Sequence, residues 1–271
     1  PAPPAAPAAP AVPAETAGDG ARSSPLRWSG DRSHDAMVKG VHERRFDVDV
    51  DGRTVPGLLW TPPDAVGPRP LVLIGHGGSG SKAEDYVVAL GRRLVRHLGY
   101  AAAAIDGPVH GDRRPEAVAG HPIVDFGLLW TSDPTMTDLM VADWRGTLDA
   151  LQRQPDIGAG PVGYWGLSMG TILGPPLVAA EPRIGVAVLG LMGLTGPTRE
   201  RLAADAPHVR CPVLFLLQWH DELFARQDVI DLFDALGSAD KRLHAHPGAH
   251  GAVPPEEFEA SERFLARHLG P

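Results

Sequence analysis

The sequence predicts an α/β protein with a doubly wound, mostly parallel sheet and helices on both faces. Two observations support this prediction. Short apolar segments of strand length alternate with longer segments whose apolar residues recur at helical spacing. Several short segments, such as Leu-Val-Leu-Ile at residues 71–74, are apolar throughout, which is typical of strands buried on both faces of a parallel sheet. Such alternation indicates a sheet built from strand–helix–strand units.

The first two strands are expected to form an antiparallel pair. Residues 46–50 alternate apolar and polar side chains, and Asp51 with Gly52 is a hairpin turn signal. Residues 55–60 then form the returning strand. The fold is therefore predicted to open with an antiparallel N-terminal strand pair before the parallel part begins.

The parallel part is predicted from residue 71 onward. The helix after the first parallel strand is expected to begin with a capping box formed by Ser81 and Glu84 and to end at Gly99. Residues 184–213 leave no room for a large lid domain. The other elements are strands at 101–105, 162–165, 184–191, 213–217 and 242–246, and helices at 141–151, 169–180, 199–204, 229–236 and 255–269.

The chain is predicted to form a single domain over residues 27–271, preceded by a flexible arm over residues 1–26. Its 271 residues include 43% hydrophobic and 21% charged side chains, which is ordinary for a globular domain of this size. The first 21 residues contain 9 Ala and 6 Pro without apolar periodicity, so they cannot bury enough apolar surface to offset the entropy of ordering them. This segment also lacks the basic and apolar regions of a secretory signal.

Charge and cysteine content exclude several kinds of partner and site. With 25 Lys and Arg against 33 Asp and Glu, the net charge of −8 opposes binding to nucleic acid or to an anionic membrane surface. The longest apolar run, residues 184–194, is shorter than the roughly 18 residues of a membrane span, so no span is predicted. The single cysteine, Cys211, excludes an intrachain disulfide and a cysteine-rich metal site. The oligomeric state is left open.

A candidate nucleophile, Ser168, lies at the centre of residues 166–170, Gly-Leu-Ser-Met-Gly, which match the pattern GxSxG. The serine follows the predicted strand 162–165 and precedes the predicted helix 169–180, which is the setting that a nucleophile elbow requires. A serine hydroxyl is a poor nucleophile unless a base removes its proton and a carboxylate holds that base. The chain must therefore bring a histidine and an acid to Ser168.

The acid and the base are predicted to be Asp221 and His250. Asp221 follows the strand 213–217, and His250 lies in a glycine-flanked loop before the last helix. Because ligands of open α/β sheets bind at the carboxyl ends of the strands, all three side chains are expected at one edge of the sheet. Glu222 competes with Asp221, since one step of register along the strand end exchanges the two acids.

Other histidines allow alternatives. His244 and His246 alternate along the last predicted strand, so they are expected on its surface rather than in place of His250. With His220, Asp221 and His250 they could form a metal site, but no second, carboxylate-rich cluster accompanies them, and the serine motif would be left unexplained. Neither a metal nor a cofactor is therefore predicted.

The chain order of Ser168, Asp221 and His250, together with Gly-His-Gly-Gly at residues 75–78 after an apolar strand, resembles the α/β-hydrolase superfamily. Within this superfamily, the sequence resembles the serine-nucleophile relatives of dienelactone hydrolases. The resemblance covers roughly residues 45–270. Dienelactone hydrolases proper use a cysteine nucleophile, so their lactone specificity is not carried over to a chain with serine at this position.

The resemblance also implies roles for residues around the serine. In this superfamily the loop after the strand supplies one oxyanion-hole N–H and the residue after the nucleophile supplies the other. Here these donors would be the backbone N–H groups of Gly78 and Met169. Asp106 and His110 resemble a structural turn of these hydrolases and are expected to shape the pocket rather than to react.

Two segments that interrupt the alternation are expected to line the substrate pocket. Residues 107–136 are rich in Gly, Pro and polar groups, and loops of this length are usually functional. Phe126 and Trp130 should form one wall of the pocket. Leu191 and Met192, which follow a strand, should form another.

The expected activity is hydrolysis of a small-molecule carboxylic ester through an acyl-enzyme intermediate on Ser168, without a cofactor. Thioesterase, peptidase and C–C hydrolase activities remain open, because they use the same three residues. A non-catalytic ligand-binding protein of this fold also remains open.

Overall fold

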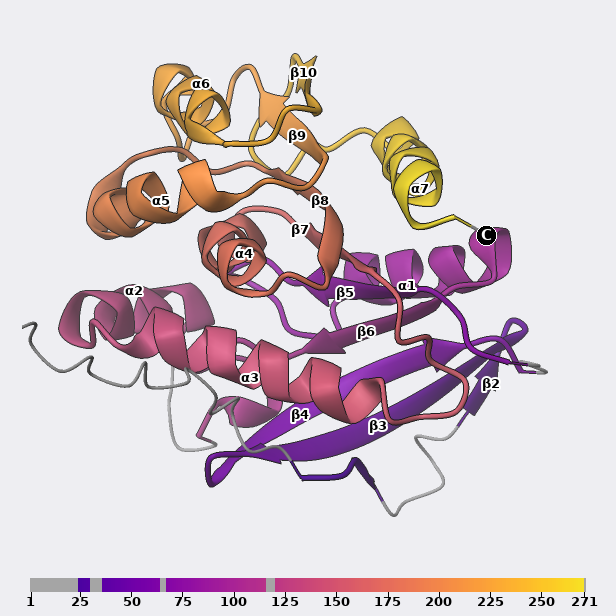
Figure 1. Ribbon diagram of the computed structural model, residues 1–271. Helices are drawn as coiled ribbons and strands as arrows, with labels where there is room; N and C mark the ends of the chain where they lie inside the picture. Colours follow the sequence, from indigo (N-terminus) through magenta and orange to yellow (C-terminus); the bar gives the residue numbers. More distant parts are fainter. Residues whose placement is uncertain (1–23, 30–35, 64–66, 116–119, 271) are drawn as a thin grey trace, which may run out of the picture.

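The computed structural model describes residues 24–29, 36–63, 67–115 and 120–270 (Figure 1). Most of the arm predicted over residues 1–26 lies outside this part. Residues 24–26 are described and contact the folded domain: the Ser24 N–H donates to Asp49 O at 2.9 Å, and Leu26 packs against the core.

The described residues form a ten-stranded sheet with helices on both faces (Figure 1). The strand order is β1-β3-β4-β6-β5-β7-β8-β9-β10, and β2 pairs with β3. The strands are β1 (Arg27–Trp28), β2 (Ala36–Val38), β3 (Val41–Val50), β4 (Arg53–Thr61), β5 (Leu71–Gly75), β6 (Ala101–Ile105), β7 (Val162–Gly166), β8 (Ile184–Gly190), β9 (Val213–Gln218) and β10 (Lys241–His246). The helices are α1 (Asp85–Leu98), α2 (Pro122–Ser132), α3 (Met136–Leu151), α4 (Met169–Ala180), α5 (Arg199–Asp205), α6 (Arg226–Ala235) and α7 (Glu256–Leu269).

The sheet has an antiparallel part and a parallel part. β3 and β4 form the predicted hairpin, with Val48 opposite Val55 and a tight turn at Asp51 and Gly52, whose φ values are 50° and 79°. β4 pairs with β6 in antiparallel orientation, and every neighbouring pair from β6 to β10 is parallel. The predicted fold class is therefore confirmed.

The sheet divides the hydrophobic core into two clusters. One lies under α1 and α7, and the other lies under α3, α4, α5 and α6 (Figure 1). Successive residues of β5 alternate between them, since Leu73 belongs to the second cluster and Ile74 to the first. This two-sided burial explains why residues 71–74 are apolar throughout. None of the helices in the described ranges is both long and apolar enough to cross a membrane.

The start of α1 differs from the predicted capping box. The N-cap residue is Glu84, which makes no side-chain capping hydrogen bond, and the Ser81 hydroxyl bonds within the preceding turn. That turn is held from outside, because the Lys82 N–H donates to the Asp106 carboxylate at 2.9 Å. At the other end, Gly99 caps the helix with a φ of 69°, as predicted.

The irregular stretch predicted at residues 107–136 contains a helix, α2. Its first residue is Pro122, which suits the first position of a helix, and the His121 ring accepts the Ile123 N–H at 3.4 Å. Apolar residues occur on all sides of this helix, so its sequence shows no amphipathic period. The sequence pattern therefore did not reveal it.

Candidate active site

Ser168 stands in a tight turn between β7 and α4, as predicted. Its backbone has φ 57° and ψ −118°, which a non-glycine residue rarely adopts. The Ser168 N–H donates to Gly190 O at 3.0 Å. The Thr171 hydroxyl oxygen lies 2.8 Å from Gly166 O and accepts the Gly190 N–H at 2.7 Å. These hydrogen bonds to the end of β8 hold the strained residue in place.

The two glycines of the motif allow three backbones to approach closely. A Cβ atom on Gly166 would lie 2.8 Å from Gly170 O, and one on Gly170 would lie 2.7 Å from Gly75 O. A larger residue at either position would push α4 away from β7 or β5. The glycine spacing thus follows from the contact of these three elements.

The structure brings the predicted serine, histidine and acid together. His250 Nε2 lies 3.0 Å from Ser168 Oγ, and His250 Nδ1 lies 2.8 Å from Asp221 Oδ2. The Asp221 side chain is only 2% exposed, and its other oxygen accepts the N–H groups of Leu223 at 2.8 Å and Phe224 at 3.1 Å. The carboxylate can therefore hold the Nδ1–H of the ring, which leaves Nε2 free to accept the serine proton.

Glu222, the competing acid, contacts the same histidine at a different atom. Its Oε2 accepts the backbone N–H of His250 at 2.8 Å. This hydrogen bond lowers the pKa of the Glu222 carboxyl. The geometry thus pairs Asp221 with the imidazole ring and Glu222 with the backbone of the loop.

The two predicted oxyanion donors lie next to each other. A Cβ atom on Gly78 would be 3.8 Å from Met169 Cβ, and Met169 directly follows Ser168. Within the described residues, neither backbone N–H donates to an acceptor of the protein. Two N–H groups without acceptors beside a serine can bind the negative charge that develops on a carbonyl oxygen.

Two buried histidines fix the loop that carries Gly78. His76 Nδ1 lies 2.8 Å from Gly77 O, and His76 Nε2 accepts the Gly107 N–H at 2.8 Å. Burial lowers the pKa of His76 to about 4, so the neutral ring donates at Nδ1 and accepts at Nε2. His110 Nε2 lies 2.8 Å from Gly78 O. The carbonyl groups on both sides of the Gly78 N–H are therefore anchored.

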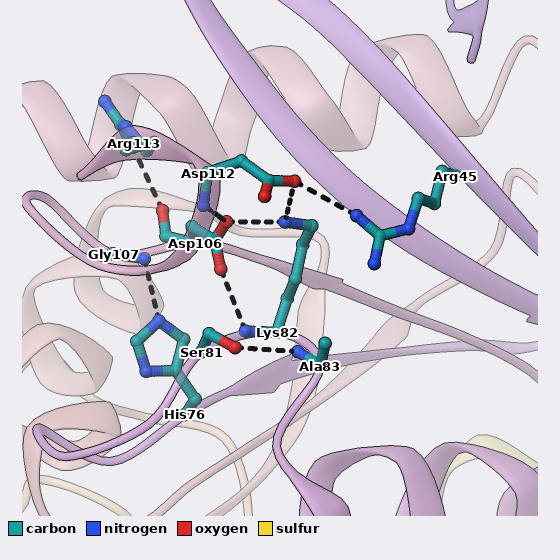
Figure 2. Close-up of polar contacts among 9 residues, drawn as sticks. All are labelled: Arg45, His76, Ser81, Lys82, Ala83, Asp106, Gly107, Asp112 and Arg113. Atoms are coloured by element: carbon teal, nitrogen blue, oxygen red, sulfur yellow. Dashed lines mark hydrogen bonds and ion pairs between the residues drawn. The ribbon is translucent and has the colours of Figure 1, made fainter. Parts of the chain in front are cut away.

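An ion-pair cluster with a buried centre joins this loop to the loop after β6 (Figure 2). Lys82 and Asp106 are 2% and 0% exposed, and Lys82 Nζ lies 2.5 Å from Asp106 Oδ2 and 2.7 Å from Asp112 Oδ2. Asp106 also accepts the backbone N–H of Asp112 at 2.8 Å. Arg45 of β3 reaches Asp112 at 3.2 Å. The turn at residues 106–112 thus holds the loop that precedes α1.

Ser168 and His250 open into a cavity of about 350 Å³. Leu191, one of the predicted wall residues, lines it. Most of the other walls are apolar as well, so the cavity suits an apolar group next to the serine. They come from Tyr86 of α1, Ile123 of α2, Trp165 of β7, Leu223 after β9, Val253 before α7 and Phe258 of α7.

Three other residues predicted to form the walls do not line this cavity. Phe126 packs edge-on against Trp130, with ring centroids 4.9 Å apart, and both belong to the core under α2. Met192 is buried in the same core cluster, whereas its neighbour Leu191 lies in the cluster on the other face of the sheet. The prediction selected large apolar side chains, but α2 packs Phe126 and Trp130 against the core and presents Ile123 to the cavity.

Tyr86, Trp165 and Phe258 line the cavity but were missed from the sequence. Each occurs in a segment with a helix or buried-strand pattern, where an aromatic residue normally indicates core packing. Only the position of Trp165 could have indicated its role, because it lies three residues before Ser168, at the end of the strand that leads to the elbow.

Two of the histidines considered for a metal site, His244 and His246, share one carboxylate partner. His244 Nδ1 lies 3.0 Å and His246 Nε2 lies 2.8 Å from Glu257 Oε1. In the part of the chain that the structure covers, no group of three or more His, Cys, Asp or Glu side chains is arranged to hold a metal ion.

Comparison with solved structures identifies relatives that cover nearly the whole chain. A cold-adapted esterase from an Arctic intertidal metagenomic library is 41% identical with a TM-score of 0.79, and the match covers 90% of this chain and 99% of that one. Two further structures share the fold. They are an acetyl xylan esterase from a Paenibacillus species (19% identity, 93% and 90% coverage, TM-score 0.70) and a dienelactone hydrolase from Anabaena variabilis (20% identity, 85% and 99% coverage, TM-score 0.64).

Sequence comparison gives one further relative. The Bacillus subtilis protein YtaP, for which a hydrolase function has been suggested, is 28% identical over 152 residues, or 52% of this chain. The match spans half of that protein, 50% of its length. No protein-family model matches the chain. The likeness to an esterase over nearly the whole chain supports the hydrolysis of ester bonds. The chain belongs to the α/β-hydrolase superfamily, with esterases and dienelactone hydrolase-like proteins among its structural relatives.

Proposed function

We propose that this chain is a serine esterase that cleaves carboxylic esters through an acyl-enzyme intermediate. The observation that carries the proposal is the hydrogen-bonded series Asp221–His250–Ser168, with distances of 2.8 and 3.0 Å, at an apolar cavity. A serine in contact with a base, beside two N–H groups without acceptors, has the geometry that acyl transfer needs. The esterase relative supports the same class of substrate.

In the first half of the reaction, His250 Nε2 accepts the hydroxyl proton of Ser168 while Oγ attacks the carbonyl carbon of the ester. Asp221 holds Nδ1–H and stabilises the imidazolium. The carbonyl oxygen becomes negative and accepts the N–H groups of Gly78 and Met169. When the tetrahedral intermediate collapses, the proton on Nε2 passes to the departing alkoxide, which leaves as the alcohol, and Ser168 keeps the acyl group.

In the second half, a water molecule takes the place of the alcohol. His250 accepts one proton of the water while the water oxygen attacks the acyl carbon. The same proton then passes from His250 to Ser168 Oγ as the carboxylic acid leaves. One ester and one water are consumed, and one alcohol and one acid are released.

Covalent labelling with a fluorophosphonate probe tests the nucleophile. The protein mass should increase by one probe, and the peptide with Ser168 should carry it. Ser168→Ala should abolish labelling and the hydrolysis of p-nitrophenyl esters. Ser132→Ala, which changes an exposed serine at the end of α2, should preserve both. A folded protein without probe on Ser168 would contradict the proposal.

Matched substrates separate the esterase from the other activities of the same three residues. An oxygen ester, a thioester and a p-nitroanilide with the same acyl group should be compared by kcat/KM. An esterase should cleave the oxygen ester much faster than the anilide. A peptidase would instead cleave the anilide about as well as the ester once each kcat/KM is divided by the alkaline hydrolysis rate of that substrate, and a non-catalytic binding protein would turn over none of the three.

A further inference from the structure

We propose, on the basis of the esterase function above, that the cavity beside Ser168 is specific for uncharged esters with a flat apolar group, preferably aromatic, and that it rejects esters that carry a carboxylate. Three features of the cavity support this specificity. They are the charge of its lining, the geometry of its aromatic wall and the character of its rim.

The lining of the cavity offers no counter-ion to a charged substrate. Its described residues include no Asp, Glu, Lys or Arg. Burial raises the pKa of Tyr86 to about 12, so this side chain is neutral at ordinary pH. Lys82, which lies close in sequence, is buried against Asp106 and does not line the cavity. A carboxylate that entered would lose its hydration without gaining an oppositely charged partner, which is strongly unfavourable.

Two acids next to the base oppose an anion further. Asp221 contacts the imidazole of His250, and Glu222 contacts its backbone N–H. Both carboxylates therefore contact the residue whose ring reaches Ser168. The net charge of the chain, −8, has the same sign. Approach and binding of an anionic ester are both disfavoured.

The aromatic wall consists of Tyr86, Trp165 and Phe258. The ring centroids of Tyr86 and Trp165 are 6.2 Å apart, as are those of Trp165 and Phe258, and the latter pair is nearly parallel at 19°. Hydrogen bonds fix two of the rings: Trp165 Nε1–H donates to Ser261 Oγ at 3.2 Å, and the Tyr86 hydroxyl accepts the Gly77 N–H at 2.6 Å. A rigid aromatic wall stabilises a flat ring beyond the effect of buried area.

The rim continues the apolar lining to the surface. Ile123 of α2 and Leu223 after β9 both line the cavity, yet they are 45% and 57% exposed. Large apolar side chains exposed at the mouth of a cavity mark a path for an apolar ligand. The substrate group thus meets apolar surface from the entrance inward.

Two pairs of p-nitrophenyl esters test the specificity, with each kcat/KM divided by the alkaline hydrolysis rate of the same ester. The hexanoate should exceed the singly charged glutarate monoester by at least about 100-fold, because the glutarate carboxylate finds no counter-ion. The benzoate should exceed the cyclohexanecarboxylate by about two- to tenfold, because only the benzoate is aromatic. Equal values within the hexanoate–glutarate pair would overturn the specificity.

Substitutions at the rim give an independent test. Leu223→Arg supplies the missing positive charge and should raise the normalised kcat/KM for the glutarate ester by about tenfold. Leu223→Gln, which adds a polar group without charge, should not. Neither should Leu128→Arg, which places the same charge on an exposed leucine of α2 that does not line the cavity. A gain that is equal in all three variants would also overturn the specificity.

Failure of this specificity is distinguishable from failure of the proposed function. If Ser168→Ala retains the hydrolysis of the hexanoate, the serine mechanism is wrong. If Ser168→Ala is inactive but the wild type cleaves the charged and neutral esters equally well, only the specificity is wrong.

Discussion

The Glu222 carboxylate accepts the backbone N–H of His250 at 2.8 Å, while the neighbouring Asp221 holds the ring of the same residue. Two adjacent acids thus position one histidine through different atoms. Asp221→Asn should lower kcat by on the order of 10³–10⁴-fold, because an amide can no longer hold the required tautomer or stabilise the imidazolium. Steady-state kinetics on a p-nitrophenyl ester measures this loss.

Substitution of Glu222 should have a much smaller effect than that of its neighbour. Glu222→Gln retains an acceptor for the His250 N–H and should keep kcat within about twofold of wild type. Glu222→Ala removes the acceptor and should lower kcat by about two- to fivefold with little change in KM. A loss in Glu222→Gln as large as that in Asp221→Asn would mean that the two acids exchange roles.

His76 should make the stability of the fold depend on pH. Its pKa is about 4 in the folded protein, below the ordinary value of 6.5, so the unfolded chain binds a proton at His76 more readily than the folded protein does. The stabilisation from neutral His76 is therefore complete above pH 6.5 and is lost as the pH falls from 6.5 to about 4. Urea unfolding of wild type across this range should show a steeper decline than that of His76→Gln.

The glutamine in this comparison can still donate and accept, so it tests the titration rather than the hydrogen bonds. Parallel pH profiles for the two proteins would show that His76 does not contribute to the decline.

The ion pair of Lys82 and Asp106 should contribute far more to stability than an exposed pair. Asp106→Asn removes the negative charge next to the buried Lys82 ammonium. It also replaces one of the two carboxylate oxygens, each of which accepts a backbone N–H, by an NH2 group that cannot accept. It should lower the free energy of unfolding by about 3 kcal/mol or more. Glu259→Gln, which breaks the exposed pair with Arg263, should change it by less than about 0.5 kcal/mol. Denaturant titration measures the free energy of unfolding of both variants, and similar losses in the two would contradict the prediction.

Two glycines in helices should respond to alanine in opposite directions. Gly170→Ala places a Cβ atom 2.7 Å from Gly75 O and should destabilise the protein by about 1–3 kcal/mol and lower kcat, because α4 must move away from β5. Gly127→Ala in α2 meets nothing within 4 Å and should stabilise by about 0.5–1 kcal/mol. Thermal unfolding and kcat should be measured for both variants. Equal melting temperatures would contradict the close contact between Gly170 and Gly75 O.

Sequence reasoning performed well where the physical cause was local. The apolar segment at residues 71–74 is buried on both faces, and the turn around Ser168 has the predicted strand and helix on either side. Each pattern reflects constraints within about ten residues. The hairpin at Asp51 and Gly52 is a third example, because positive φ values there favour these residue types.

The predictions that failed depended on tertiary structure. Ser81 does not cap α1, because Asp106 from another loop holds the turn before the helix. Phe126 does not line the cavity, because the rotation of α2 about its axis is set by packing and is not encoded in an amphipathic pattern. Met192 differs from Leu191 only by one step along the chain, and that step moves its side chain to the other face of the sheet.

The order of the site residues along the chain has a consequence for protein synthesis. Gly78 follows β5, and Ser168 and Met169 stand between β7 and the start of α4, whereas Asp221 and His250 follow β9 and β10. A ribosome therefore completes the serine and both N–H donors about eighty residues before the histidine, as their numbers show. On the proposed roles, a nascent chain that has already folded its central strands carries an inert serine, and it gains the ability to react with esters only when β10 joins the edge of the sheet.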